Sequence, residues 1–200
     1  MSRSSLRREA RSARAAASSF EAERLLALRA ALFSAPDVAR DVLADFAAFT
    51  RFDRNGLDAD IFFTSPGSPR WSSALEIFAL EVTERNMRSL YESAKGWGWD
   101  SDAKRAELQS PENRYLVARA RGVDANGADG GEFLGFVSFR FVSEAALDVL
   151  YVYELQLAAQ AQRKGLGKFL MQLCELIARK QGMQACVRML PNTARASRKS

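Results

Sequence analysis

The chain has 200 residues, 48% of them hydrophobic, and a formal net charge of +5. This length and composition suffice for one substantial core, so we expect a single globular domain. The sequence has no histidine and only two cysteines, Cys174 and Cys186, which excludes a histidine-based triad and an ordinary zinc site. We therefore expect no metal, and a reducing compartment in which both thiols are buried.

Membrane association is not expected, because no window approaches the roughly 20 consecutive apolar residues of a membrane span. The N-terminus also lacks the apolar segment of a secretory signal. Its content of Arg, Ser and Ala resembles a transit peptide, which keeps organelle import as a minority alternative.

The charge is distributed unevenly along the chain. Residues 1–19 carry five arginines and one glutamate, a charge of +4, and residues 188–200 carry four basic residues and no acid, another +4, so residues 20–187 account for −3 of the total of +5. A mildly acidic body suits a cationic peptide substrate better than DNA. Residues 1–19 are expected to be a basic disordered arm, which is either simply solvated or in contact with chromatin.

The first half of the chain predicts mainly helices, because apolar residues recur at helical intervals. The helical segments are residues 20–34, 36–49, 73–95 and 102–109. Ser73 and Glu76 fit a capping box at the start of the third segment. Between the second and third segments, the composition predicts a turn over 53–56, a strand over 61–64 and a loop over 65–69.

The second half predicts strands, then one helix and a last strand. The strands are expected over residues 115–120, 133–142 and 149–157, with a hairpin at Asn126-Gly127 between the first two. A helix over 165–181 and a strand over 185–190 follow. This order indicates an α/β fold with a right-handed βαβ unit. The polar residues 191–200 are expected to be a disordered tail.

A glycine-containing loop joins the strand over 149–157 to the helix over 165–181. Residues 160–170 read QAQRKGLGKFL, directly after the apolar run VLYVYELQL. Glycines at Gly165 and Gly167 let the backbone approach an anion closely, and the helix that starts there adds free N–H groups and a positive dipole end. The loop therefore predicts a pyrophosphate-bearing ligand.

The loop fits neither of two common nucleotide motifs. Lys168 is followed by Phe169, so the hydroxyl that a nucleoside-triphosphate loop needs for magnesium is missing. Leu170 stands where the dinucleotide motif has its third glycine. What remains is Q-x-x-G-x-G over residues 162–167, and a structural strand-to-helix glycine turn is the alternative reading.

This motif resembles the acetyl-CoA loop of the GNAT acyltransferase superfamily. Further segments resemble, in the same order, the N-terminal acetyltransferase D family, whose members acetylate the amino termini of histones that begin Ser-Gly-Arg-Gly. These segments are FDRNGL (52–57), NMRSLYE (86–92), WGW (97–99), FVSFRF (136–141) and YVYELQL (151–157). The resemblance implies a GNAT fold over residues 20–190: a mixed, mainly antiparallel sheet flanked by helices, with extra N-terminal helices.

The resemblance also implies a set of site residues. Glu154, which interrupts an apolar strand, is implied as the catalytic base that takes a proton from an amine. A substrate pocket is implied at Tyr91, Trp97, Tyr151 and Tyr153. Acetyl-CoA is implied as the acetyl donor, held by Leu155, Gln156, Leu157, Arg163, Lys164, Gly165, Leu166, Gly167 and Lys168.

Each of these roles has a purely structural alternative. Glu154 fits equally a strand-end glutamate paired with an arginine, and each tyrosine fits core packing. Strict alternation places Tyr151 and Tyr153 on the face opposite Glu154, unless a β-bulge of the kind found in GNAT folds intervenes. Cys174 lies mid-helix with no histidine to activate it, so a buried structural thiol is expected there.

The sequence departs from the family in two places. Val142 stands where the family has an acidic substrate contact, although Glu144 and Asp148 lie nearby and can supply negative charge. Ten residues follow Leu190, where GNAT domains continue with a helix and two strands, so the last strands of the fold are expected to be missing.

Together these features predict an N-α-acetyltransferase of protein N-termini, in particular histone tails, located in the nucleus and cytoplasm. Two other functions remain open. One is a non-catalytic coenzyme-binding or chromatin-interaction module, and the other is a small-molecule GNAT acetyltransferase. The aromatic residues of the WGW and YVY segments argue against the second.

Overall fold

The computed structural model describes residues 41–94, 98–122, 131–144 and 147–188. The predicted arm, the tail, the helix over 20–34, the start of the next helix and the Asn126-Gly127 hairpin lie outside these ranges.

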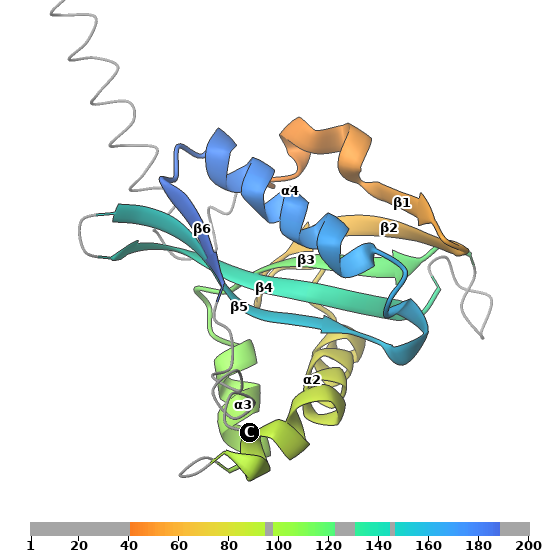
Figure 1. Cartoon of the computed structure of the whole chain (residues 1–200), viewed down its shortest axis with the longest axis vertical. Helices are drawn as coiled ribbons and strands as arrows, with labels where there is room; N and C mark the ends of the chain where they lie inside the picture. The colour runs from red at the N-terminus through yellow and green to blue at the C-terminus, as the bar shows by residue number, and fades with distance from the viewer. Residues whose placement is uncertain (1–40, 95–97, 123–130, 145–146, 189–200) are drawn as a thin grey trace, which may run out of the picture. The chain divides into compact units, whose positions relative to one another are not determined.

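A six-stranded sheet forms the centre of the described structure (Figure 1). Its strands follow chain order in space and comprise β1 (Arg51–Arg54), β2 (Leu57–Thr64), β3 (Arg114–Ala120), β4 (Phe133–Glu144), β5 (Leu147–Leu157) and β6 (Ala185–Arg188). Neighbours from β1 to β5 are antiparallel, and β6 is parallel to β5. The predicted mixed, mainly antiparallel sheet of an α/β fold is confirmed.

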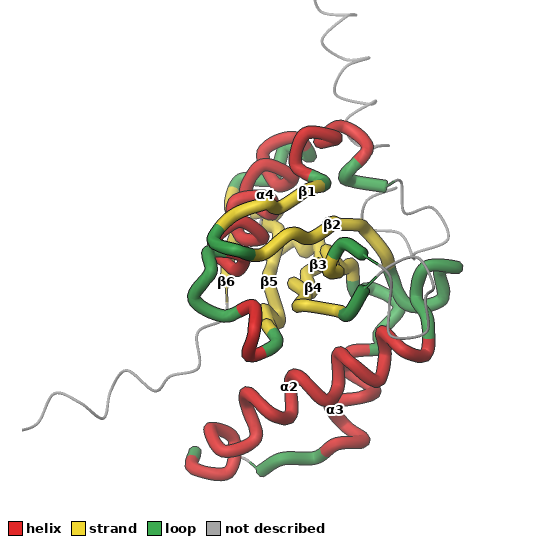
Figure 2. The backbone as a smooth tube through the Cα atoms, turned by 90° about the vertical axis from the view of Figure 1, so that its right-hand side faces the viewer, coloured by secondary structure: helices red, strands yellow, loops and turns green. Residues whose placement is uncertain are grey.

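Helices cover both faces of this sheet. The helical elements are η2 (Ala44–Phe49), α2 (Ser73–Ser93), α3 (Ser101–Leu108), η3 (Ala159–Ala161) and α4 (Leu166–Lys180). Figure 2 shows α4 on one side of the strands and α2 with α3 on the other. The two faces of β5 therefore meet different helices.

The face under α2 and α3 is a hydrophobic core. Leu75 and Ala79 of α2 and Leu108 of α3 pack with Tyr115 of β3 and Phe136 of β4, and all five are buried. Rings of Trp71 and Phe78 pack against the edges of this cluster. Burial of this kind contributes about 1.5 to 3 kcal/mol for each large apolar side chain, which anchors both helices to the sheet.

Helix α4 forms on the opposite face because its sequence carries a continuous apolar stripe. Its buried residues share one face of the helix and are Leu166, Leu170, Leu173, Cys174, Ile177 and Ala178. Gly165 immediately before the helix has φ of +91°, and Gly182 just after it has φ of +71°. Left-handed residues at both ends explain why glycine stands at these two positions.

Several sequence-based details need correction. Ser72, not Ser73, caps α2, because its hydroxyl accepts a hydrogen bond from the Leu75 amide at 3.2 Å. The predicted turn over 53–56 is narrower: Asn55 and Gly56, both with positive φ, form a two-residue hairpin between β1 and β2. Cys174 is buried as expected, but Cys186 is only half-buried, because it lies on the short last strand.

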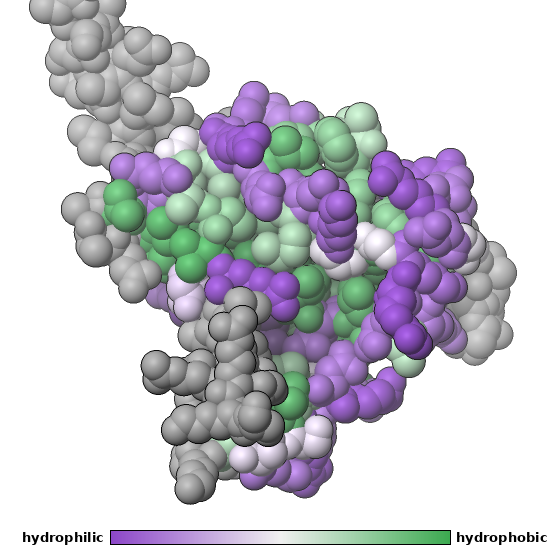
Figure 3. All heavy atoms as spheres, viewed as in Figure 1, coloured by the Kyte–Doolittle hydropathy of each residue, from purple (hydrophilic) through white to green (hydrophobic). Residues whose placement is uncertain are grey.

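Exposed apolar surface is scattered rather than gathered. The large hydrophobic side chains that are most exposed in the described ranges come from three elements and are Phe49, Ile77, Leu90 and Leu147. On the face seen in Figure 3, green hydrophobic residues lie between groups of purple hydrophilic ones. Within the described residues, no helix combines the length and the apolar character needed to cross a bilayer.

Candidate functional site

The loop between β5 and α4 presents backbone amides that pair with no backbone carbonyl in the described part of the chain. Arg163, with φ of +60°, and Gly165 both adopt left-handed conformations. Within the described chain, the amides of Gly165, Gly167 and Lys168 make no hydrogen bond to another backbone carbonyl. Free amides at a helix N-terminus bind anionic oxygens, so this loop can hold a pyrophosphate.

Two side chains fix the shape of this loop. Asn55, in the β1–β2 hairpin, donates a hydrogen bond to the carbonyl of Lys164 at 2.8 Å. Gln162 donates to the carbonyl of Leu157 at 3.1 Å. Because both bonds engage carbonyls, they leave the N–H groups of the loop available to a ligand.

The predicted coenzyme-contacting residues take different positions. The side chain of Leu166 is fully buried, so only its backbone can face a ligand, whereas Arg163 and Lys168 are exposed and carry positive charge. The side chains of Leu155 and Leu157 lie against Gly167 on the α4 face. Gln156 points to the other face, where its side chain donates a hydrogen bond to Glu154.

Strand β5 has an edge that is open beside the loop. β6 pairs with β5 only over Val149–Val152, and among the described residues no strand pairs with β5 on that side from Tyr153 to Leu157. Unpaired backbone groups at a strand edge can bond an extended chain. The edge therefore leads from Tyr153 directly to the anion-binding loop.

A β-bulge interrupts β5 at Tyr153. Glu154 pairs with Ser138 of β4, but Val152 pairs with the very next residue, Phe139, so Tyr153 is an extra residue in β5. Such an insertion reverses the alternation of side chains beyond it. The bulge expected for a GNAT fold is therefore present.

The bulge brings the two tyrosines to the face that carries Glu154. Tyr151 and Tyr153 contact each other, with ring centroids 4.8 Å apart, and the Arg140 guanidinium lies 4.7 Å from the Tyr153 ring centroid. Arg140 also donates to the Asn113 side chain at 2.7 Å. Because Asn113 in turn contacts the Tyr115 hydroxyl in the α2–α3 core, this entire group lies on the face of Glu154.

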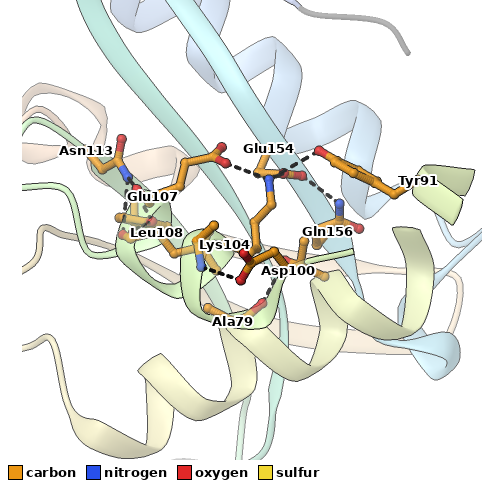
Figure 4. Close-up of polar contacts among 12 residues, drawn as sticks. Ala79, Tyr91, Asp100, Lys104, Glu107, Leu108, Asn113, Glu154 and Gln156 are labelled. Atoms are coloured by element: carbon orange, nitrogen blue, oxygen red, sulfur yellow. Dashed lines mark hydrogen bonds and ion pairs between the residues drawn. The ribbon is translucent and has the colours of Figure 1, made fainter. Parts of the chain in front are cut away.

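Glu154 is buried and its two carboxylate oxygens have different partners (Figure 4). Oε1 accepts a hydrogen bond from Lys104 Nζ at 3.1 Å, and Oε2 accepts one from Gln156 Nε2 at 2.7 Å. Gln156 is itself held by Asn86 of α2 through its side-chain oxygen at 3.0 Å. The alternative of a paired glutamate is thus partly right, with a lysine in place of the arginine.

Lys104, on α3, binds three partners at once. Its ammonium lies 2.8 Å from Glu107, 3.1 Å from Glu154 and 3.2 Å from the Tyr91 hydroxyl. Burial alone lowers the pKa of this ammonium, but the hydrogen bond to Glu107 and the charges of Glu154 and Glu107 outweigh it and hold the pKa above its usual range. Lys104 is therefore a permanent cation within the site.

The aromatic residues of the predicted pocket are only partly described. Tyr91 lies with its hydroxyl on Lys104 and its ring edge-on to Trp99, at 5.8 Å between centroids. Trp99 donates to the Ser101 hydroxyl at 2.9 Å, which ties its ring to the first residue of α3. Trp97 lies outside the described residues.

Sequence reasoning missed Lys104, Asn113 and Arg140, which complete this cluster. One signal was available: Lys104 and Leu108 are four residues apart, so the apolar face of the short helix α3 carries a lysine. A lysine on a buried helix face needs a carboxylate partner. Glu107 on the same helix is one such partner, but its side chain is 42% exposed, which points to a second, buried carboxylate.

The acidic positions near Val142 differ in their access to solvent. Val142 lies half-buried on β4, and Asp148, at the start of β5, is 5% exposed. The side chain of Glu144 lies outside the described part.

A metal site is not apparent in the described part of the chain, where no three His, Cys, Asp or Glu side chains are grouped for ligation. The described residues instead combine an anion-binding loop, an open strand edge and a buried carboxylate beside aromatic side chains.

Comparison with known proteins identifies the family of this chain. The family described as the acetyltransferase (GNAT) family matches residues 84–198. A ribosomal-protein-alanine N-acetyltransferase from Brucella melitensis biovar Abortus 2308 is 20% identical, with a TM-score of 0.44, covering 68% of this chain and 82% of its own. An aminoglycoside acetyltransferase from an uncultured soil metagenomic sample is 18% identical, with a TM-score of 0.42, covering 66% of this chain and 78% of its own. Members of the matched family use acetyl-CoA, and because that match spans more than half of the sequence, this chain belongs to the GNAT acetyltransferase family.

Proposed function

We propose that this GNAT acetyltransferase is an N-α-acetyltransferase that modifies protein N-termini, with histone tails beginning Ser-Gly-Arg-Gly as its expected substrates. The observation that carries this proposal is the bulge at Tyr153, which turns Tyr151 and Tyr153 to the face of Glu154 beside the open edge of β5. Aromatic side chains around a carboxylate suit the small, positively charged end of a peptide.

The coenzyme would lie along β5 and end at the loop before α4. Acetyl-CoA supplies the acetyl group as an activated thioester. The free amides near Gly165 and Gly167 would bind its pyrophosphate, and the charges of Arg163, Lys164 and Lys168 would add to that attraction. Leu155 and Leu157, which line Gly167, would keep the strand in place beneath it.

Glu154 would act on the amine of the peptide. An N-terminal amine has a solution pKa of about 7.7 to 8.0, so only modest assistance is needed to obtain the neutral, nucleophilic form. The carboxylate of Glu154 would accept the proton, directly or through one water molecule. Direct transfer to the amine needs no covalent enzyme intermediate, in agreement with the buried, unactivated Cys174.

The pocket would select a small first residue. Tyr91 and Tyr153 approach the site from α2 and β5, and Arg140 braces the Tyr153 ring. Rigid aromatic rings enclose little space and offer hydroxyl groups to the peptide backbone. Serine followed by glycine would fit such a space better than a large side chain.

Mass spectrometry of a Ser-Gly-Arg-Gly peptide, incubated with the chain and acetyl-CoA, tests the proposal. We expect one acetyl group on the α-amine, and no product from the same peptide with a blocked N-terminus. A panel that includes lysine side-chain amines and aminoglycosides distinguishes the alternatives. Turnover only on small molecules would make the chain a small-molecule acetyltransferase, and coenzyme binding without any turnover would make it a binding module.

Contact with chromatin through residues 1–19 and a nuclear and cytoplasmic location belong to the same proposal. Both rest on the five arginines of that segment. Removal of residues 1–19 should leave peptide turnover unchanged and weaken salt-sensitive retention on nucleosomes.

A further inference from the structure

One buried cation in the site is not used by the proposed reaction. Lys104 has a side chain 6% exposed and lies between Glu154, at 8%, and Glu107, at 42%. The two carboxylates come from different elements, since Glu107 is one helical turn along α3 and Glu154 is on β5. Lys104 therefore links the helix to the reactive strand.

The charges of Lys104 and its two carboxylate partners do not cancel. Two carboxylates share one ammonium, so the cluster of Lys104, Glu107 and Glu154 carries a net charge of −1. Glu107 lies closer to the ammonium and is open to water, whereas Glu154 is buried and depends on the ammonium and on Gln156. A buried carboxylate without an opposite charge is costly, so protonation of Glu154 is sensitive to Lys104.

We infer that Lys104 is a positioning residue that keeps Glu154 ionised and oriented, and that Glu107 limits how strongly it does so. The inference rests on the proposed function, in which Glu154 is the base, and adds to it the residue that sets the pH range of that base. Lys104 acts through Glu154 and does not itself exchange a proton with the substrate.

The surroundings of Lys104 explain this division of roles. Its pKa is held above the usual range, so it neither releases a proton near neutral pH nor accepts one. The Tyr91 hydroxyl accepts its third hydrogen bond, and the ammonium lies 5.2 Å from the centre of the Tyr91 ring. The ammonium is thus fixed on three sides, which fixes the Oε1 atom of Glu154 as well.

Other ionisable groups that face Glu154 are few. Tyr91 approaches from α2 and Tyr115 from β3, and burial raises the pKa of Tyr115, which keeps its hydroxyl neutral near physiological pH. Arg140, from β4, carries a charge on the same face but is bound to Asn113 and Glu112. Lys104 and Glu107 are therefore the groups whose removal should shift the protonation of Glu154 most.

Titration of the Glu154 carboxyl by ¹³C NMR tests the inference without requiring activity. The full-length chain with ¹³C-labelled glutamate is used, and the Glu154 signal is assigned by its loss in Glu154→Gln. In Lys104→Met, the pH at the midpoint of the Glu154 titration should rise by about 1 to 3 units, which is the usual effect of losing an opposite charge at this distance. A midpoint equal to that of the parent chain would overturn the inference.

Two further variants separate charge from general disturbance. Arg105→Met removes the neighbouring cation on α3, which pairs with Glu76 at 3.5 Å, and should leave the midpoint unchanged. Glu107→Gln removes the half-exposed carboxylate that competes for the Lys104 ammonium, so the titration midpoint of Glu154 should fall. A rise in either variant as large as that of Lys104→Met would contradict the assignment.

Turnover then links the titration to the reaction. The acid limb of the kcat/KM profile should move with the NMR midpoint, to higher pH in Lys104→Met and to lower pH in Glu107→Gln. A moved midpoint with no turnover in any chain would reject the proposed function but retain the role of Lys104. A moved midpoint with an unmoved acid limb would show that Glu154 is not the base.

Loss of folding in Lys104→Met would also be informative. The double variant Lys104→Met with Glu154→Gln removes both charges and should recover most of the thermal stability lost in the single variant. If the double variant is as unstable as the single one, the ammonium serves packing alone and the inference fails. If Lys104→Met does not fold, the titration of Glu154 in the Glu107→Gln variant still provides the NMR test.

Discussion

Substitution of Gly167 tests the anion-binding loop with little disturbance of the fold. A Cβ atom on Gly167 would lie 3.4 Å from a Leu157 methyl group and 3.7 Å from a Leu155 methyl group, which are ordinary contacts. Alanine is also a better helix former than glycine by about 1 kcal/mol. Gly167→Ala should therefore fold at least as well as the parent, and Gly167→Asp should place a carboxylate where a phosphate is expected.

The expected magnitude follows from ligand linkage. Acetyl-CoA at about 100 times its Kd stabilises a folded chain by about 2.7 kcal/mol, which corresponds to about 5 to 10 °C in Tm for a chain of this size. We expect Gly167→Asp to lose nearly all of this shift and Gly167→Ala to lose part of it. Differential scanning fluorimetry with and without acetyl-CoA measures both.

Gly182, at the other end of α4, is the matched control. Its φ is +71° and its surroundings are open, so Gly182→Ala should lower the Tm of the free chain but leave the acetyl-CoA shift intact. If Gly167→Asp retained the full shift, the coenzyme would not bind at this loop, and the assignment of residues 163–168 would be refuted.

Three further predictions concern stability and substrate binding. Gly135→Ala should lower the Tm by several degrees, because the new Cβ would lie 2.6 Å from the Gln156 carbonyl oxygen; an unchanged Tm would contradict the β4–β5 packing. Burial raises the pKa of Cys174, so its contribution to stability is complete below the unfolded thiol pKa of about 8.5 and declines by about 1.4 kcal/mol per pH unit above it. Urea denaturation at pH 8 and pH 10 should therefore show a smaller alkaline loss for Cys174→Ala than for the parent. Arg140→Lys should raise the peptide KM severalfold and leave coenzyme binding unchanged, since lysine keeps the charge but not the planar contact with Tyr153; equal KM values would remove Arg140 from the pocket.

Local patterns predicted the elements that carry strong periodic signals. The apolar stripe from Leu166 to Ile177 and the glycines at its two ends predicted α4 to within a residue or two. The strand over 149–157 was also found, although the structure begins it two residues earlier. These elements depend on spacing within one segment, which a single sequence shows directly.

The interactions that complete the site join segments far apart in the chain. Lys104 meets Glu154 across a separation of 50 residues, and Asn55 meets the Lys164 carbonyl across 109. In sequence, Lys104 stands among charged residues and reads as part of an exposed helix. The four-residue spacing to Leu108 places Lys104 on the apolar face of α3, but its contact with Glu154 follows only from the packing of α3 beneath the sheet.

The bulge at Tyr153 illustrates the same limit. Period-two alternation alone places Tyr151 and Tyr153 away from Glu154, and a single inserted residue in the β4–β5 register reverses that result. Only the resemblance to GNAT proteins suggested the insertion. Register depends on pairing with Ser138 and Phe139, and not on the composition of β5.

The rate of peptide acetylation by the parent chain and by Glu154→Gln, compared from pH 6 to pH 10, tests the central claim most directly. Glutamine keeps the shape of the side chain and cannot take a proton. At pH 7 the variant should have a kcat lower by about 10²-fold or more, with acetyl-CoA binding retained. Above the amine pKa of about 8 the deficit should shrink, because the solution then supplies the neutral amine. A ratio near one, or a deficit that is constant across the range, would show that Glu154 is not the base.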